Sequence, residues 1–161
     1  MPEYKNLSLK SQLCFALYSA THTIVRFYTS KLAVVGLTYP QYLVLIVLWE
    51  RDGISVKQVA ETLDLDSGTL TPILKRLETS GFVQRKRNSK DGRIVKLFLT
   101  KEALGLKKRV ARIQRLVACQ TGLPDSEFVE LRDKLNGLVK AMNTKPESDS
   151  KANRRPAYGL R

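Results

Sequence analysis

The sequence lacks any long apolar run. No uninterrupted apolar stretch approaches the roughly 20 residues needed to span a bilayer. Residues 1–5 do not lead into a signal-peptide pattern, because the segment that follows is mixed and has no small-residue cleavage site. We therefore expect a cytoplasmic, reducing location and no membrane partner.

Cysteine and histidine are scarce as well. The chain has two cysteines, Cys14 and Cys119, and one histidine, His22, which follows Cys14 by eight residues. This spacing does not suit a zinc site, so we expect no metal and no cofactor. In a reducing compartment the two cysteines need an explanation other than a standing structural disulfide.

Acidic residues are few relative to basic ones. The 161 residues, a length typical of one compact domain, include 15 Asp and Glu against 28 Lys and Arg, which gives a net charge of +13. This balance favours a polyanionic partner, either nucleic acid or an anionic membrane surface, over a merely soluble basic protein.

The N-terminal part has a helical period. One long helix is predicted from Leu7 to Val35, ended by Gly36. Most globular helices are shorter, so part of its apolar face is expected to pack on a second copy of the chain. The residues that carry the period are Leu13, Leu17, Ala20, Ile24 and Phe27.

A second helix is predicted to form the core. Thr38 is a candidate N-cap, Pro40 fits the first turn, and Gln41 completes a capping box. Residues 42–49 are apolar on nearly all sides, which is typical of a buried helix.

A helix-turn-helix is predicted next. Ser55 and Gln58 form another capping box before a short amphipathic helix, and residues 63–66 form the turn. The following helix has Ser67 or Thr69 as its N-cap; the choice stays open because Pro72 would lose a helical bond if the helix began early.

The two faces of this last helix differ in chemistry. The apolar positions Leu70, Ile73, Leu74 and Leu77 recur at i, i+3, i+4 and i+7, which predicts one buried face. The other face has small hydroxyls and cations suited to the base edges and phosphates of a DNA groove. Its members are Ser67, Thr69, Thr71, Lys75 and Arg76.

A basic β-hairpin follows. Residues 82–87 and 94–99 are rich in β-branched and aromatic side chains, and the loop between them contains Asp91-Gly92, a turn signal. Residues 75–109 contain twelve Lys or Arg against three acids, so the cations concentrate where phosphates would lie. A last helix is predicted over residues 123–142, and residues 144–161 have the composition of a flexible basic tail.

These motifs together resemble the MarR family of winged helix-turn-helix repressors. The resemblance covers residues 7–142 and rests on Asp66–Glu78 and on Asp91-Gly92-Arg93 in the wing. Leu13–Tyr18, Tyr28 and Thr38–Tyr42 look like its organic-hydroperoxide-sensing OhrR branch. It implies a mainly α fold with a small β-wing and N- and C-terminal dimerisation helices. The domain would span residues 1–143, with the DNA-binding part at about 38–100.

The resemblance also implies roles for single residues. Ser67, Thr69 and Arg76 would contact bases or phosphates in the major groove, and Arg93, steadied by Asp91, would enter the minor groove. Further, mainly phosphate, contacts would come from Lys75, Arg85 and Arg87. A homodimer would then place two such helices about one DNA turn apart on a palindromic operator.

The cysteines would act as a switch. In the OhrR branch, tyrosine hydroxyls of the partner subunit stabilise the reactive thiolate, and the matching positions are Cys14, Tyr28 and Tyr39, with Tyr18 one turn from Cys14. An organic hydroperoxide would oxidise Cys14, and Cys119 of the other subunit would resolve it as a disulfide. The plainer alternative is that both cysteines are small packed apolar residues.

Two other functions remain open. One is a repressor released by a noncovalent phenolic or other apolar ligand between the DNA-binding and dimerisation regions. The other is a thiol peroxidase, which is disfavoured because no Arg or His accompanies Cys14 in a cysteine motif and a basic wing has no use in that chemistry. The expected function is therefore transcriptional repression rather than catalysis.

Overall fold

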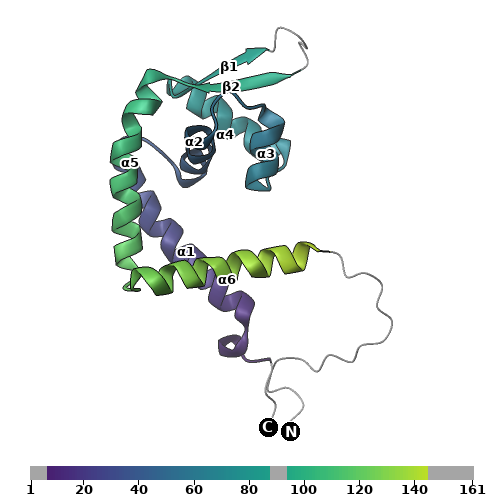
Figure 1. Cartoon of the computed structure of the whole chain (residues 1–161), viewed down its shortest axis with the longest axis vertical. Helices are drawn as coiled ribbons and strands as arrows, with labels where there is room; N and C mark the ends of the chain where they lie inside the picture. The colour runs from purple at the N-terminus through teal and green to yellow at the C-terminus, as the bar shows by residue number, and fades with distance from the viewer. Residues whose placement is uncertain (1–6, 88–93, 145–161) are drawn as a thin grey trace. The chain divides into compact units, whose positions relative to one another are not determined.

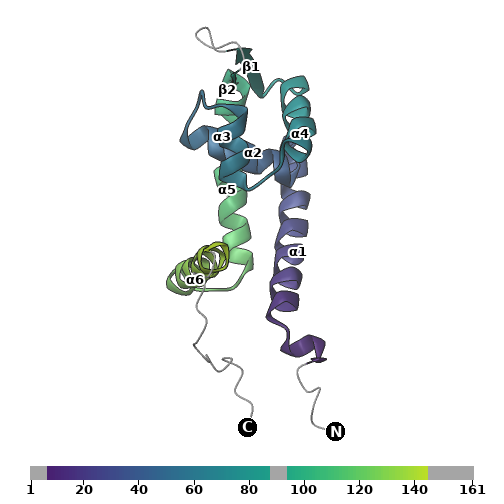
Figure 2. The ribbon, with the colours of Figure 1, turned by 90° about the vertical axis from the view of Figure 1, so that its right-hand side faces the viewer.

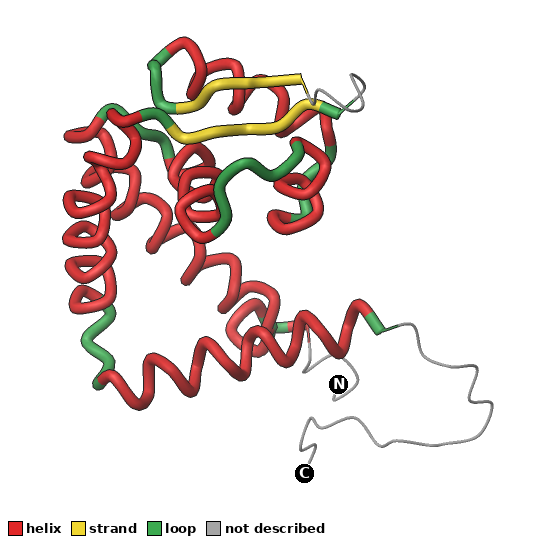
Figure 3. Tube along the Cα trace, turned by 45° about the horizontal axis from the view of Figure 1, so that its top comes forward, coloured by secondary structure: helices red, strands yellow, loops and turns green. Residues whose placement is uncertain are grey.

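The computed structural model describes residues 7–87 and 94–144 (Figure 1). Over this part the chain is mainly helical with one two-stranded hairpin, which confirms the expected fold class (Figure 3). Two compact units divide the chain, one up to Thr121 and one from Gly122 on. The elements in chain order are α1 (Leu13–Leu32), α2 (Tyr39–Glu50), α3 (Val56–Leu63), α4 (Ser67–Thr79), β1 (Val83–Arg87), β2 (Val95–Leu99), α5 (Lys101–Gln120) and α6 (Asp125–Asn143).

Helix α1 is shorter than the single helix predicted over residues 7–35. A 3₁₀ turn at Leu9–Ser11 precedes it, and Gln12 between them is extended, with φ −87° and ψ 115°. Leu32 is the one buried residue of α1, so packing within the chain does not hold its N-terminal turns in a continuous helix. Gly36 ends this region in the left-handed conformation, at φ 70°, as predicted.

Helix α2 is the central core helix that its apolar sequence predicts. The Thr38 backbone N–H donates to Gln41 Oε1 at 2.8 Å, so the predicted capping residue Gln41 satisfies a donor at the helix start. At the other end, Trp49 Nε1 donates to the Ala103 carbonyl of α5 at 3.2 Å. The buried residues of α2 are Gln41, Tyr42, Val44, Leu45, Val47 and Leu48.

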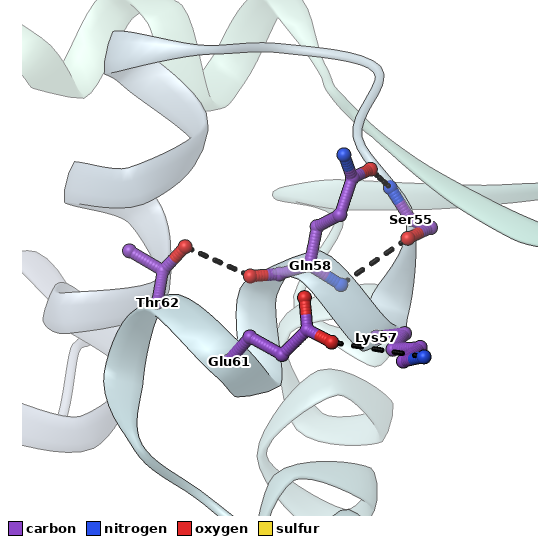
Figure 4. Close-up of polar contacts among 5 residues, drawn as sticks. All are labelled: Ser55, Lys57, Gln58, Glu61 and Thr62. Atoms are coloured by element: carbon purple, nitrogen blue, oxygen red, sulfur yellow. Dashed lines mark hydrogen bonds and ion pairs between the residues drawn. The ribbon is translucent and has the colours of Figure 1, made fainter.

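Helix α3 and the turn after it follow the predicted helix-turn-helix. The Ser55 N–H donates to Gln58 Oε1 at 2.9 Å and the Gln58 N–H donates to Ser55 Oγ at 3.2 Å, so both halves of the capping box form (Figure 4). Asp64 then takes the left-handed conformation at φ 51°, which ends α3 and turns the chain into α4.

The hairpin is bonded to the segment that precedes α3. Strands β1 and β2 are antiparallel, with Val83 opposite Leu99, and each begins one residue later than predicted. The Gly53 N–H donates to the Leu97 carbonyl, and the Leu97 N–H donates to the Ile54 carbonyl, at 3.0 and 2.9 Å. These bonds hold the base of the wing against the start of the helix-turn-helix.

Helix α5 leads from the wing back along α1. Thr100 caps it by accepting the Ala103 N–H at 3.2 Å, and Arg109 Nη2 reaches the Val34 carbonyl at 3.4 Å. Figure 2 shows α1 and α5 extending in the same direction from the winged part. One face of α5 packs inward through Ala103, Leu106, Val110, Ile113 and Val117.

Helix α6 starts at Asp125, two residues later than predicted, and none of its residues is buried. Residues 145–161, nearly all of the predicted tail, lie outside the described residues.

Among the described residues no single helix is long and apolar enough to cross a membrane. The segments Leu13–Val35 and Tyr39–Glu50 together have the length and composition of a membrane span, but the chain bends by 75° between them and half of the residues of the second are buried.

Truncation of Leu74 tests this core. Leu74 of α4 is 1% exposed, so Leu74→Ala leaves a cavity and should lower the free energy of unfolding by about 2–5 kcal/mol in urea denaturation. Leu104→Ala is the matched control, since Leu104 of α5 is 55% exposed. Equal losses for the two variants would contradict the packing described here.

Candidate nucleic-acid interface

Helix α4 separates the two kinds of side chain that its sequence pattern predicts. Of the four positions predicted to be buried, Leu70, Leu74 and Leu77 are buried, and Ile73 is partly buried against the core. All five predicted DNA-facing residues are exposed: Ser67, Thr69, Thr71, Lys75 and Arg76. The exposed face therefore offers hydroxyls and cations together, which is the chemistry of a groove-binding surface.

The N-cap of α4 is Asp66, so the predictions of Ser67 and Thr69 were both wrong. Asp66 Oδ1 accepts the Thr69 backbone N–H at 2.9 Å, and Oδ2 accepts the Thr69 hydroxyl at 2.6 Å. Pro72 consequently lies inside the helix, which forgoes one backbone hydrogen bond there. The two bonds that Thr69 donates to Asp66 stabilise the first turn despite that loss. Because the Thr69 hydroxyl already donates to Asp66, its Oγ1 can accept a hydrogen bond from DNA but cannot donate one.

The remaining polar side chains of α4 differ in their hydrogen bonds and ion pairs within the chain. The Thr71 hydroxyl donates to the Ser67 carbonyl at 2.6 Å, so it too is oriented by the helix. Lys75 and Arg76 form no ion pair with any residue that the structure describes. These two cations are therefore available to an anionic partner.

The cations of β1 are not equivalent. Arg85 Nε lies 3.2 Å from Glu78 Oε2 of α4, and the Arg85 side chain is 30% exposed. Its charge is partly neutralised within the chain, whereas Arg87 is exposed. The predicted wing-tip residues Asp91 and Arg93 lie outside the described residues.

The two cysteines lie near the outer ends of long helices. Cys14 is the second residue of α1 and Cys119 the penultimate residue of α5, and both are free and exposed. In the chain as described, neither is a buried apolar residue.

Three tyrosines gather where α1 meets α2. The Tyr28 ring centroid lies 5.2 Å from those of Tyr39 and Tyr42, and the latter two are 5.9 Å apart. We call these residues the tyrosine cluster. Sequence reasoning missed Tyr42, although its place one turn after Tyr39 on the same helix was a usable signal.

Burial weakens the acidity of Tyr39 and Tyr42. It raises the pKa of Tyr39, to which the neighbouring Tyr28 adds. It also raises the pKa of Tyr42, with further contributions from a hydrogen bond with Tyr28 and from the nearby phenols. Near neutral pH Tyr39 and Tyr42 are therefore protonated, and their hydroxyls can donate hydrogen bonds.

Cys14 is far from the tyrosine cluster within one chain. Tyr28 follows it by fourteen positions of continuous helix, which is about 21 Å along the axis. Tyr18, the nearer predicted partner, is 65% exposed and stacks on His22 at 6.0 Å. The structure of a single chain thus brings Tyr28 and Tyr39 together but not to Cys14.

A metal centre is absent from the part of the chain that the structure describes, where no three His, Cys, Asp or Glu side chains group together.

The Asp66 cap leads to a pH-dependent prediction. Hydrogen bonds from the Thr69 hydroxyl and, next, its backbone N–H hold the pKa of Asp66 below its usual range. Because the folded pKa is below the unfolded one, the stabilisation is present above the unfolded pKa, about 4, and is lost as pH falls through the folded pKa.

We therefore expect the melting temperature of the wild type to drop more than that of Asp66→Asn between about pH 5 and about pH 2. The asparagine keeps one acceptor oxygen but carries no charge, so the difference between the two proteins reports the effect of the ionised carboxylate. Identical pH profiles of the two melting curves would rule out the charged cap.

Residues 37–95 match the model of the MarR family, and several transcriptional regulators are similar to this chain. The chain is 52% identical over 131 residues to the HTH-type transcriptional regulator TtmR of Methylorubrum extorquens (strain PA1), covering 81% of this chain and 67% of that one. It is 36% identical over 143 residues to the organic hydroperoxide resistance transcriptional regulator of Bacillus subtilis (strain 168), covering 89% and 97%.

Solved structures of AbfR of Staphylococcus epidermidis are also similar. Reduced AbfR bound to DNA has a TM-score of 0.70 and 36% identity, over 83% of this chain and 94% of that one. Disulfide-formed AbfR has a TM-score of 0.60 and 37% identity, over 81% and 92%. The relatives are regulators, which sets aside the thiol-peroxidase alternative. The chain belongs to the MarR family of winged helix-turn-helix proteins, DNA-binding transcriptional regulators that are not enzymes.

Proposed function

We propose that this regulator is a homodimeric repressor that senses organic hydroperoxides through Cys14. The reduced dimer binds a palindromic operator, and oxidation of Cys14 leads to a disulfide with Cys119 of the partner subunit and to release of the DNA. The observation that carries the proposal is that both cysteines are free and exposed, on helices that keep them apart within one chain.

The distance between the cysteines favours a bond between subunits. One cavity is lined by the C-terminal end of α5, including Gln120, and by residues of α1. Thr23 is the most N-terminal of these α1 residues. Cys14 precedes Thr23 by nine residues, about 13 Å along the helix. Because a disulfide needs Cα atoms within about 7 Å, Cys14 is out of reach of Cys119 in its own chain.

The proposed chemistry has two steps. The Cys14 thiolate attacks the terminal oxygen of the hydroperoxide; the S–O bond forms, the O–O bond breaks, and the alkoxide takes a proton and leaves as an alcohol. The Cys119 thiolate then attacks the sulfenic sulfur, the S–S bond forms, and the hydroxyl leaves with a proton as water. Sulfur is oxidised and the peroxide is reduced.

The tyrosines would support the thiolate between subunits. Tyr28 and Tyr39 cannot reach Cys14 in their own chain, so in the proposal their hydroxyls donate to Cys14 of the partner subunit. Tyr18 would support it from one turn along the same helix. The names of the Bacillus subtilis relative and of disulfide-formed AbfR agree with this type of sensing.

The dimer would hold two α4 helices in successive major grooves. Exposed apolar side chains on α1 and α6, among them Leu13, Phe15 and Leu131, favour pairing with a second copy. In this proposal residues 1–143 form the dimerising domain, and about 38–100 bind DNA. The residues assigned to DNA are Ser67, Thr69, Thr71, Lys75, Arg76, Arg85, Arg87, Asp91 and Arg93.

One cavity favours a second candidate function. Between α1 and α5 lies a space of about 350 Å³ whose lining includes the apolar side chains Ile24, Phe27 and Val117. A small apolar or phenolic ligand could bind there and release the DNA noncovalently, with the cysteines incidental.

The test is operator binding with and without cumene hydroperoxide. We expect Cys14→Ser to bind the operator as the reduced wild type does and to stay bound at peroxide concentrations that release the wild type fully, because serine forms no sulfenic acid. Electrophoretic mobility shifts measure operator binding before and after peroxide treatment.

Cys119→Ser provides the matched control for the second step. It should form no covalent dimer on nonreducing gels, and mass spectrometry should find Cys14 advancing to sulfinic acid. Release of Cys14→Ser by peroxide would overturn the redox proposal and favour the ligand candidate.

A further inference from the structure

A cavity of about 520 Å³ lies where the α1–α2 turn meets the exposed side of α4. Gly36, Thr38 and Gln41 line it from the turn and the start of α2, and the rest comes from α4 and the residue after it: Pro72, Lys75, Arg76, Thr79 and Ser80. None of these residues is acidic. We call this space the corner cavity.

The charges around the corner cavity are positive. Lys75 and Arg76 are exposed and form no ion pair with any described residue. The cavity also lies at the N-terminus of the 12-residue helix α2, where the helix dipole is positive.

Gln41 adds a donor to the corner cavity. It is 6% exposed, and its Oε1 accepts the Thr38 N–H at 2.8 Å, which fixes the orientation of the amide. The amide NH₂ group has no acceptor within the described part of the chain. Among the described residues Gln41 has no buried side-chain atom left without a partner, so this NH₂ group is reachable from the cavity that Gln41 lines, and an oxygen from outside the chain can accept from it.

We propose that the corner cavity receives a phosphodiester group of the operator backbone. Its donors are the Gln41 amide and the cations Lys75 and Arg76, and an anion with several oxygens satisfies them together. The site flanks α4 on its exposed side, next to a groove that α4 would occupy. This inference deepens the DNA-binding part of the proposed function and does not depend on oxidation of Cys14.

The test substitution is Gln41→Glu. Glutamate keeps the oxygen that accepts the Thr38 N–H and suits the third position of a helix, but it replaces the donor with a carboxylate that repels phosphate. We expect operator affinity of the reduced protein to fall at least tenfold at fixed salt, with the melting temperature retained.

Gln58→Glu is the matched control. Gln58 makes the same capping bond at the same position of α3, but the cavity it lines contains two carboxylates, Glu50 and Glu61, against one cation, Arg51, so it does not favour an anion. Both variants change the net charge by the same amount, so the difference between them reports the local contact. Equal affinities of the two variants would overturn the proposal.

Neutral methylphosphonates placed singly along the operator locate the contact. One backbone position should weaken wild-type binding and no longer weaken binding of Gln41→Glu. If instead no position distinguishes the two proteins, while inorganic phosphate raises the melting temperature of the wild type but not that of Gln41→Glu, the cavity holds a free anion and the proposal is wrong. All these measurements use reduced protein, so a failure of peroxide release leaves them unaffected.

Discussion

The burial of α2 on nearly every side is the constraint on which the rest of the winged part depends. Helix α2 contacts α1, α3, α4, α5 and β2, and Val44, Leu45 and Leu48 have no exposed surface. A helix packed in this way moves as a rigid piece, because sliding it would open voids against five neighbours. The first turn of α2 and the recognition helix α4 are therefore held at a fixed separation.

That rigidity gives the α1–α2 corner two roles in the proposed mechanism. Tyr39 and Tyr42 of the tyrosine cluster and Gln41 of the corner cavity all lie within the first four residues of α2. One side of this turn would support the partner's Cys14, and the other would hold a phosphate. A change at the sulfur would then reach the DNA through a single helical turn, without any long pathway across the core.

The sequence was sufficient to predict those features that are determined by neighbouring residues along the chain. The capping residues Gln41 and Gln58 and the stop at Gly36 follow from neighbouring residues, and the exposed face of α4 follows from its period. The N-cap Asp66 was not predicted, because Pro72 indicated a later helix start, whereas the two bonds that Thr69 donates to Asp66 outweigh the bond that proline loses.

Features that depend on tertiary geometry could not be predicted in this way. The ion pair between Arg85 and Glu78 depends on how β1 packs against α4, which no local sequence pattern predicts. The break at Gln12 reflects the absence of buried contacts along the start of α1, again a property of the fold. The extent of the tyrosine cluster likewise depends on how α1 crosses α2.

The spacing along α1 is what makes a symmetric sensor feasible. Cys14 and Tyr28 lie equally far, seven residues, on either side of Thr21. If two α1 helices pair antiparallel about a two-fold axis near Thr21, each Cys14 comes level with Tyr28 of the partner subunit. Both sensor sites then form at once, and neither forms in a single chain, because about 21 Å of helix separates the groups there. Sensing and dimerisation would accordingly be one property of the same helix.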